Sequence, residues 1–231
     1  MKCPALRNVP ENKLTFALKQ IDENYDDDSV MVRRKACHRY FDANIPVRYW
    51  NLEMHRDFEG DNGILSYYKN LITDIPKLYN EGLAIILAGG FGRGKTMVAT
   101  NLLKRALEKG YTGLYVGLND VISAITSNEK FTARRELLEA HFLVIDEFDS
   151  RHMAQSGNAQ DFFGRIIEDI LRIRLNNQMP IILCTNNIDV VSAFRDSLQE
   201  SLASLMNYMD IVPVLGSDYR PIEKQKRLSG E

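Results

Sequence analysis

Residues 84–96 read Ala-Ile-Ile-Leu-Ala-Gly-Gly-Phe-Gly-Arg-Gly-Lys-Thr and are the most informative part of the chain. The first five are wholly apolar, which is typical of a strand buried on both faces of a parallel sheet. The last eight follow the pattern GxxxxGK(S/T), and a helical pattern over 96–109, closed by Gly110, comes next. A strand, a glycine-rich loop and a helix in this order predict a phosphate-binding loop.

The chemistry of such a loop assigns a role to each part of the motif. The glycines let backbone N–H groups point at phosphate oxygens, and the N-terminus of the next helix adds partial positive charge. Lys95 is expected to contact the β- and γ-phosphates, and the Thr96 hydroxyl to bind Mg²⁺. The predicted nucleotide-binding residues are Gly89, Gly90, Phe91, Gly92, Arg93, Gly94, Lys95, Thr96 and Met97.

Two acidic residues follow a second apolar run about fifty residues downstream. Residues 141–147 read His-Phe-Leu-Val-Ile-Asp-Glu, so the predicted strand ends in Asp146 and Glu147. Ligands bind at the carboxyl ends of parallel strands. Asp146 is therefore expected to share the Mg²⁺ with Thr96, and Glu147 to act as the general base for the attacking water. Asn186, after a further apolar run, is expected either to orient that water or to belong to an Asn-rich turn.

Strand and helix patterns alternate along most of the chain, which predicts an α/β fold with a parallel sheet covered on both faces. Further strands are expected over 114–116, 142–145, 181–184 and 211–215, with helices over 65–79, 162–171 and 190–209. Two helical stretches precede Asn44-Ile45-Pro46, where the residue before proline disfavours helix. We therefore expect an N-terminal helical appendage over 1–44, a candidate partner-binding region, and a core over 45–231.

Composition excludes several classes of protein. The chain has 231 residues, 45% of them hydrophobic, which predicts a globular protein rather than a disordered or fibrous one. No apolar run approaches the roughly 20 residues that cross a bilayer, so no membrane association is expected. The net charge of −2 argues against a protein that coats nucleic acid over its whole surface. The N-terminus has no signal-peptide pattern, and three unpaired cysteines favour a reducing, cytoplasmic location.

Several segments together resemble the AAA+ ATPases, and within them the clade of DnaC-type replicative-helicase loaders and IstB-type transposition helpers. The resemblance rests on the phosphate loop, on the acidic strand, and on residues 43–50, 180–186 and 216–220, which read Ala-Asn-Ile-Pro-Val-Arg-Tyr-Trp, Pro-Ile-Ile-Leu-Cys-Thr-Asn and Gly-Ser-Asp-Tyr-Arg. It implies a P-loop NTPase with five parallel strands in the order 5-1-4-3-2. The short C-terminal region implies a reduced or absent lid.

The same resemblance implies further site residues. Asn186 resembles the sensor that reads the γ-phosphate, and Arg220 resembles a second sensor arginine. Members of such families usually form rings or spirals with ATP between subunits, so a homo-oligomer or a joint assembly with a helicase is expected. Arg174 is a candidate contact to a neighbour's nucleotide, or else a solvated cation at a helix end.

The chain departs from its relatives at the position of the arginine finger. Relatives tend to carry an Asp-Arg pair where this chain has Ala203 and Ser204. An arginine finger contributes about 10³-fold or more to hydrolysis in NTPases that use one. Hydrolysis is therefore expected to be slow, to need a partner, or to use Arg174 instead. Phe91 and Arg93 replace a Pro and a Thr, which leaves cradling by the loop backbone intact.

A basic and aromatic cluster lies between the second and third predicted strands, where this clade carries helical structure that can line a pore for single-stranded DNA. A cation beside an aromatic ring can hold a phosphate and stack a base. The alternative is a core phenylalanine beside solvated arginines. The candidate DNA-binding residues are Lys130, Phe131, Arg134 and Arg135.

Three functions follow from these observations. The first is an ATP- and Mg²⁺-dependent ATPase that loads a replicative hexameric DNA helicase and contacts single-stranded DNA. The second is an IstB-like transposition helper that binds duplex DNA, which the acidic net charge disfavours because coating a duplex needs many cationic contacts. The third is a regulatory ATP-binding module with little turnover.

Overall fold

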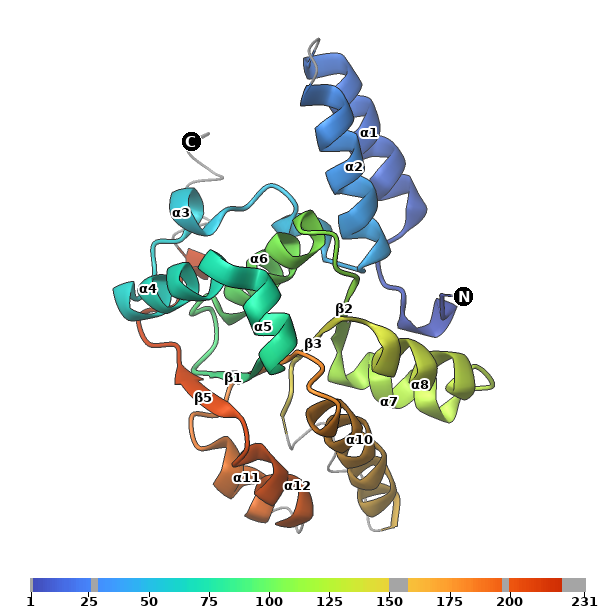
Figure 1. The fold of residues 1–231 in the computed structure, drawn as a ribbon, viewed down its shortest axis with the longest axis vertical. Coiled ribbons are helices and arrows are strands. Elements are labelled where there is room, and N and C mark those ends of the chain that lie inside the picture. Colours follow the sequence, from blue (N-terminus) through green and yellow to red (C-terminus); the bar gives the residue numbers. More distant parts are fainter. Residues whose placement is uncertain (1, 26–28, 150–157, 197–199, 222–231) are drawn as a thin grey trace.

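The fold, seen in a computed structural model, is a parallel sheet between two layers of helices (Figure 1). The structure describes residues 2–25, 29–149, 158–196 and 200–221. The five strands lie in the order β2-β3-β4-β1-β5 and all pairs are parallel. This is the predicted order read from the other edge, so the predicted α/β P-loop architecture is confirmed.

The strands are short and apolar, as the sequence predicts. Their bounds are β1 Ala84–Ala88, β2 Gly113–Gly117, β3 Phe142–Asp146, β4 Ile181–Thr185 and β5 Asp210–Pro213. β3 and β4 are buried over their whole length, and β1 over all but its first residue. The fifth strand begins one residue earlier than predicted and ends two residues earlier.

Each central strand divides its side chains between two cores, because successive residues of a strand point to opposite faces. Ile86, Leu143 and Leu183 belong to the core beneath the helices after β2 and β3. Leu87 and Val144 belong to the core beneath the helix that follows the phosphate loop. Both faces of the sheet are thus covered, which explains why the strands read as continuous apolar runs.

The helices differ from the predictions mainly in where they break. The predicted helix over 65–79 is divided because Asp74 caps a new helix through Lys77 N (3.0 Å) and Pro76 occupies its first turn. The helix predicted over 162–171 is α10, which extends over Asn158–Asn176; the side chains of 158–163 lie outside the described part. The remaining helices are α1 Glu11–Asn24, α2 Ser29–Asp42, α3 Met54–Asp57, α4 Asn62–Leu71, α5 Ile75–Glu81, α6 Lys95–Glu108, α7 Leu118–Thr126, α8 Lys130–Glu139, α11 Val190–Asp196 and α12 Glu200–Met206. Short 3₁₀ turns cover Pro4–Leu6, Val47–Tyr49 and Ile72–Asp74.

Helices α1 and α2 pack side by side and project from the sheet domain as an arm (Figure 1). The base of the arm is tied to the sheet by Asn44, whose side-chain amide donates to Leu6 O and Tyr115 O, both at 2.9 Å. The division of the chain at residue 44 stays a prediction. None of the described helices is long and apolar enough to cross a membrane.

Candidate nucleotide site

The phosphate loop connects β1 to α6 and depends on glycine at two positions. Gly92 and Gly94 have φ of 69° and 92°, in the left-handed region that favours glycine. A Cβ on Gly94 would lie 2.5 Å from the Phe58 ring, and one on Gly92 would lie 1.7 Å from a carboxylate oxygen of Asp218. The backbone conformation therefore favours glycine at both positions, and a side chain at either one would also have to displace Phe58 or Asp218.

Lys95, the first residue of α6, turns its ammonium group into this loop. Nζ donates to Gly89 O and Gly90 O, both at 2.8 Å, and to Asn186 Oδ1 at 3.0 Å. Only 7% of the residue is exposed, and this burial lowers the pKa of Lys95. Lys95 follows β1 and Asn186 follows β4, and the structure brings them together. Both residues are expected to contact the γ-phosphate.

Thr96 and Asp146, the two predicted Mg²⁺ ligands, are in direct contact. Thr96 Oγ1 donates to Asp146 Oδ2 at 2.8 Å, and Tyr115 OH donates to the same oxygen at 2.6 Å. A hydroxyl and a carboxylate are oxygen donors that suit Mg²⁺, which usually takes one or two carboxylates and completes its shell with phosphates and water. These residues therefore fit the ion.

Glu147 follows Asp146 with φ of 54°, an uncommon conformation for a residue with a side chain. Its backbone N–H donates to Asp146 Oδ1 at 2.7 Å, and its own side chain is exposed at the cavity. The turn therefore separates the two carboxylates: one is held beside Thr96 and the other faces solvent, where a general base would meet water.

These groups open into one cavity of about 730 Å³, within the usual range for ligand pockets. Seven of the nine predicted nucleotide-binding residues line it. The other two, Gly89 and Gly90, act from behind through their carbonyl groups. The lining residues are Arg48, Tyr49, Leu52, Arg56, Asp57, Phe58, Glu59, Phe91, Gly92, Arg93, Gly94, Lys95, Thr96, Met97, Asp146, Glu147, Asn186, Tyr219 and Arg220.

The C-terminal segment after β5 folds over the phosphate loop. Tyr219 N donates to Gly92 O at 3.1 Å. The Arg220 guanidinium carbon lies 5.9 Å from the centre of the Phe91 ring, and Arg220 lines the cavity. The position predicted for the second sensor arginine is thus at the rim of the pocket, although it comes from the far end of the chain.

Arg174 requires a correction, because it is neither a contact to a neighbouring subunit nor a solvated helix-end cation. It is fully buried at the end of α10. Its guanidinium donates to Leu137 O at 2.8 Å and to Pro180 O at 2.6 Å, with further contacts to Leu138 O and His141 O, both at 3.2 Å. Burial lowers its pKa to about 10, so it stays charged at neutral pH. Arg174 holds the starts of β3 and β4 and the end of α8 together.

The position of the missing arginine finger lies on α12. Ala203 is buried there and Ser204 is exposed. A finger has to reach the site of a neighbouring subunit, and Ser204 is exposed. Its hydroxyl carries no positive charge, however, so it does not replace an arginine. With Arg174 buried, neither residue supplies a cation to a neighbouring nucleotide.

The four candidate DNA-binding residues lie on α8, which does not line the nucleotide cavity. Phe131 is 78% exposed, so it is not a core residue, and Lys130 Nζ lies 5.3 Å from its ring centre. Arg134 pairs with Asp169 at 2.7 Å, and Arg135 pairs with Glu139 at 3.8 Å. Exposed ion pairs are worth at most about 1 kcal/mol, so a phosphate can replace them.

A sequence model of one family, described as novel STAND NTPase 3, matches residues 70–230, well over half of the chain. The chain belongs to the novel STAND NTPase 3 family. The match includes the phosphate loop, the acidic strand and Asn186, which makes this STAND NTPase a P-loop NTPase by sequence as well as by fold. A search of curated proteins returned no match.

Solved structures similar to this STAND NTPase are replication proteins of the AAA+ type. The DnaC helicase loader matches with a TM-score of 0.59 and 22% identity over 73% of this chain and 99% of that chain. DnaI matches with a TM-score of 0.58 and 16% identity over 76% and 94%. AMPPCP-bound DnaA from Aquifex aeolicus matches with a TM-score of 0.54 and 16% identity over 74% and 53%. At these identities the likeness shows the fold, and the expected DnaC-type AAA+ fold is confirmed.

Two parts of this site were not found by sequence reasoning. The first is Tyr115, whose hydroxyl binds Asp146 from the neighbouring strand; its strand was predicted, but not which face the side chain occupies. The second is the part of the cavity wall that Arg48, Leu52 and Phe58 form beside Tyr49. The resemblance of residues 43–50 to the family is a signal for Arg48 and Tyr49, and no local pattern marks Leu52 or Phe58.

Proposed function

We propose that this NTPase binds and hydrolyses ATP with Mg²⁺ and acts as a loader of a replicative DNA helicase. The observation that carries the ATPase part is the pair of contacts at the loop: Thr96 Oγ1 to Asp146 Oδ2 at 2.8 Å, and Lys95 Nζ to Asn186 Oδ1 at 3.0 Å. One pair supplies oxygen ligands for the ion and the other supplies a cation and an amide for the terminal phosphate. Both pairs are within hydrogen-bond distance.

Each residue has a defined task in this proposal. Lys95 exchanges the carbonyl oxygens of Gly89 and Gly90 for phosphate oxygens, and the loop N–H groups and the α6 N-terminus hold the remaining negative charge. Mg²⁺ bound by Thr96 and Asp146 would neutralise charge on the β- and γ-phosphates. Glu147 takes the proton of the attacking water, and Asn186 orients that water against the γ-phosphate.

The loader part rests on the fold and on two surfaces. One of the similar structures, matched over 99% of its own chain, is that of a helicase loader. Phe131 and Lys130 offer an exposed aromatic and a cation to single-stranded DNA, where stacking is worth roughly 1–3 kcal/mol per base. The arm of α1 and α2 exposes Phe16 and Met31 and offers a helicase a surface away from the nucleotide.

The test is co-purification with a hexameric replicative helicase in the presence of a non-hydrolysable ATP analogue, with ATP turnover measured with and without single-stranded DNA. A nucleotide-dependent complex is expected. Phe131→Ala should weaken single-strand binding about tenfold, whereas Phe16→Ala, at another exposed phenylalanine on the arm, should leave it unchanged. Absence of any helicase complex together with steeply salt-dependent duplex binding would replace the loader with a transposition helper.

A regulatory switch with slow turnover is the second candidate, and the positions of Arg174 and Ser204 favour it. Neither offers an exposed cation that could complete a neighbour's site. ATP binding without measurable hydrolysis, even with helicase and single-stranded DNA present, would select this function over the loader ATPase.

A further inference from the structure

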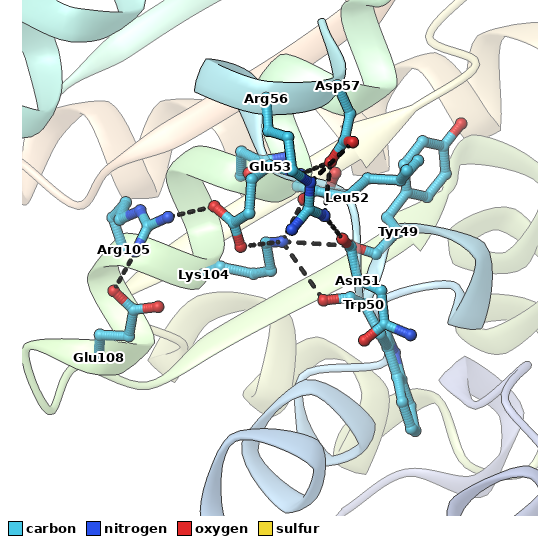
Figure 2. A network of polar contacts seen from close by, with 12 residues as sticks. Tyr49, Trp50, Asn51, Leu52, Glu53, Arg56, Asp57, Lys104, Arg105 and Glu108 are labelled. Atoms are coloured by element: carbon cyan, nitrogen blue, oxygen red, sulfur yellow. Dashed lines mark hydrogen bonds and ion pairs between the residues drawn. The ribbon is translucent and has the colours of Figure 1, made fainter. Parts of the chain in front are cut away.

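Lys104 is a lysine with no exposed surface, two turns beyond the phosphate loop on α6. Its ammonium is enclosed by one short stretch of chain (Figure 2). Nζ donates to Leu52 O at 2.5 Å, to Tyr49 O at 3.2 Å and to Glu53 Oε1 at 3.0 Å, and it lies 3.5 Å from Trp50 O. Residues 49–53 therefore wrap around a single buried charge.

A second layer of contacts fixes the same stretch from outside. Glu53 also pairs with Arg105 on the next position of α6. Glu53 N donates to Asp57 Oδ2 at 2.7 Å, and Arg56 binds both Asp57 and the backbone oxygen of Asn51 (Figure 2). Residues 49–53 have almost no regular secondary structure. Hydrogen bonds and ion pairs hold them in place along their whole length.

The wrapped stretch is also a wall of the nucleotide cavity. Tyr49 and Leu52 line the cavity, together with Met97 from α6 and Phe58. These are aromatic and apolar side chains, and the charged residues beside this stretch, Arg48, Arg56, Asp57 and Glu59, also line the cavity. Phosphates and Mg²⁺ suit Lys95, Thr96 and Asp146, whereas the flat, largely apolar face of a nucleobase suits side chains such as Tyr49 and Leu52.

We propose that Lys104 is a positioning residue for the nucleobase: its ammonium folds residues 49–53 into the shape that brings Tyr49 and Leu52 to the cavity. This rests on the proposed binding of ATP. Lys104 itself is buried away from the cavity, so it acts only through the carbonyl groups that it holds. A buried charge keeps its place only if each of its donors finds an acceptor, and three carbonyls and a carboxylate supply them here.

The pKa of Lys104 reflects both its burial and its partners. Burial lowers the pKa of Lys104, and the hydrogen bond and charge of Glu53 oppose that shift. A methionine at this position would keep most of the side-chain length and remove the ammonium. The carbonyls of Tyr49 and Leu52 would then lose their shared donor, and the wall would lose its anchor.

The experiment compares two ligands on the full chain, ATP and inorganic tripolyphosphate, by measuring both dissociation constants. Lys104→Met should raise the Kd for ATP about tenfold, because a small displacement of the wall spoils base contacts. The Kd for tripolyphosphate should change less than about twofold, because the phosphate loop is untouched. Lys109→Met, on an exposed residue at the end of the same helix, is the matched control and should change neither.

Equal changes for both ligands, or no change for either, would overturn the proposal and leave Lys104 a residue of the core. If Lys104→Met does not fold, Glu53→Gln decides, because it keeps one oxygen acceptor for Lys104 while removing the negative charge and the oxygen that binds Arg105. A raised ratio of ATP to tripolyphosphate Kd supports the proposal and an unchanged ratio overturns it. Failure of the unaltered chain to bind either ligand would instead contradict the proposed function.

Discussion

Helix α6 carries two buried lysines, Lys95 at its first residue and Lys104 about one turn before its end, and they differ in what surrounds them. Lys95 and Lys104 are both enclosed by backbone carbonyl groups. Lys104 also pairs with Glu53, whereas no carboxylate in the described part of the chain forms an ion pair with Lys95. One positive charge is therefore neutralised by the protein and the other is held ready for an anion.

Access to the cavity separates charges that serve a ligand from charges that hold structure. Arg174, like Lys104, is fully buried and donates to backbone carbonyl groups through its two terminal nitrogens, while its Nε has no partner among the described residues. Lys95 and the exposed Glu147 instead face the cavity. Burial alone does not distinguish the two kinds, because Lys95 is itself 93% covered. Carbonyl partners do not distinguish them either, since all three cations have them; Lys95 differs in lining the cavity.

The largest effect is expected at the ligand-facing lysine. Lys95→Ala should weaken ATP binding by about 10³-fold, because it removes charged hydrogen bonds to two phosphates. The fold should persist, since only the loop loses a donor. Isothermal titration with ATP measures the affinity, and Lys109→Ala is the control. Unchanged affinity would show that Lys95 is a structural lysine like Lys104.

Glu147 tests the acid on the ligand side. Glu147→Gln should reduce ATP turnover by about 10²-fold while the affinity for ATP stays the same, because the amide cannot accept the proton of water. Steady-state turnover and ATP titration on the same preparation measure both. Turnover equal to that of the unaltered protein would remove Glu147 from the role of general base.

The Arg174→Met variant tests whether a buried cation stabilises the fold. Arg174→Met should lower the free energy of unfolding by about 3 kcal/mol, because four carbonyl oxygens lose their donors in a buried place. Urea unfolding measures this loss, and Arg172→Met, on an exposed arginine two residues earlier, should lose far less. Normal stability combined with lost hydrolysis in an assembly would restore the contact to a neighbouring nucleotide.

The smallest expected effect is a dependence of the ATP affinity on pH, and it should come from Lys95 alone. ATP binds the protonated form, and burial lowers the pKa of Lys95 from its ordinary value of 10.5. ATP affinity should therefore fall as the pH rises through that lowered pKa. The lowered pKa also makes the contribution of Lys95 to folding stability rise with pH. The reason is that, around that pKa, the unfolded chain binds more protons than the folded chain.

Titrations with ATP across the alkaline range measure this dependence. Residual binding by Lys95→Arg should stay flat over the same range, since a guanidinium keeps its proton. An identical fall in both proteins would assign the effect to another group.

The local sequence determined much of this protein. The glycine spacing, Lys95, Thr96 and the acids after β3 are predictable because a phosphate loop acts through a few consecutive residues, and because parallel strands bring their carboxyl ends to one edge. The apolar runs predicted the five strands, and the resemblance to the AAA+ ATPases implied their order, which is confirmed. Asn186 was placed in the site by the same rule.

Tertiary structure alone decided the fate of Arg174, Lys104 and Tyr115. Arg174 at a helix end gives no local sign of whether it meets solvent, a neighbour or carbonyl groups 33–37 residues away. The partners of Lys104 lie 51–55 residues earlier in the chain. A side chain's type and spacing specify what it is able to bind, but packing decides which groups come within 3 Å of it, and so whether its charge holds the fold or awaits a ligand.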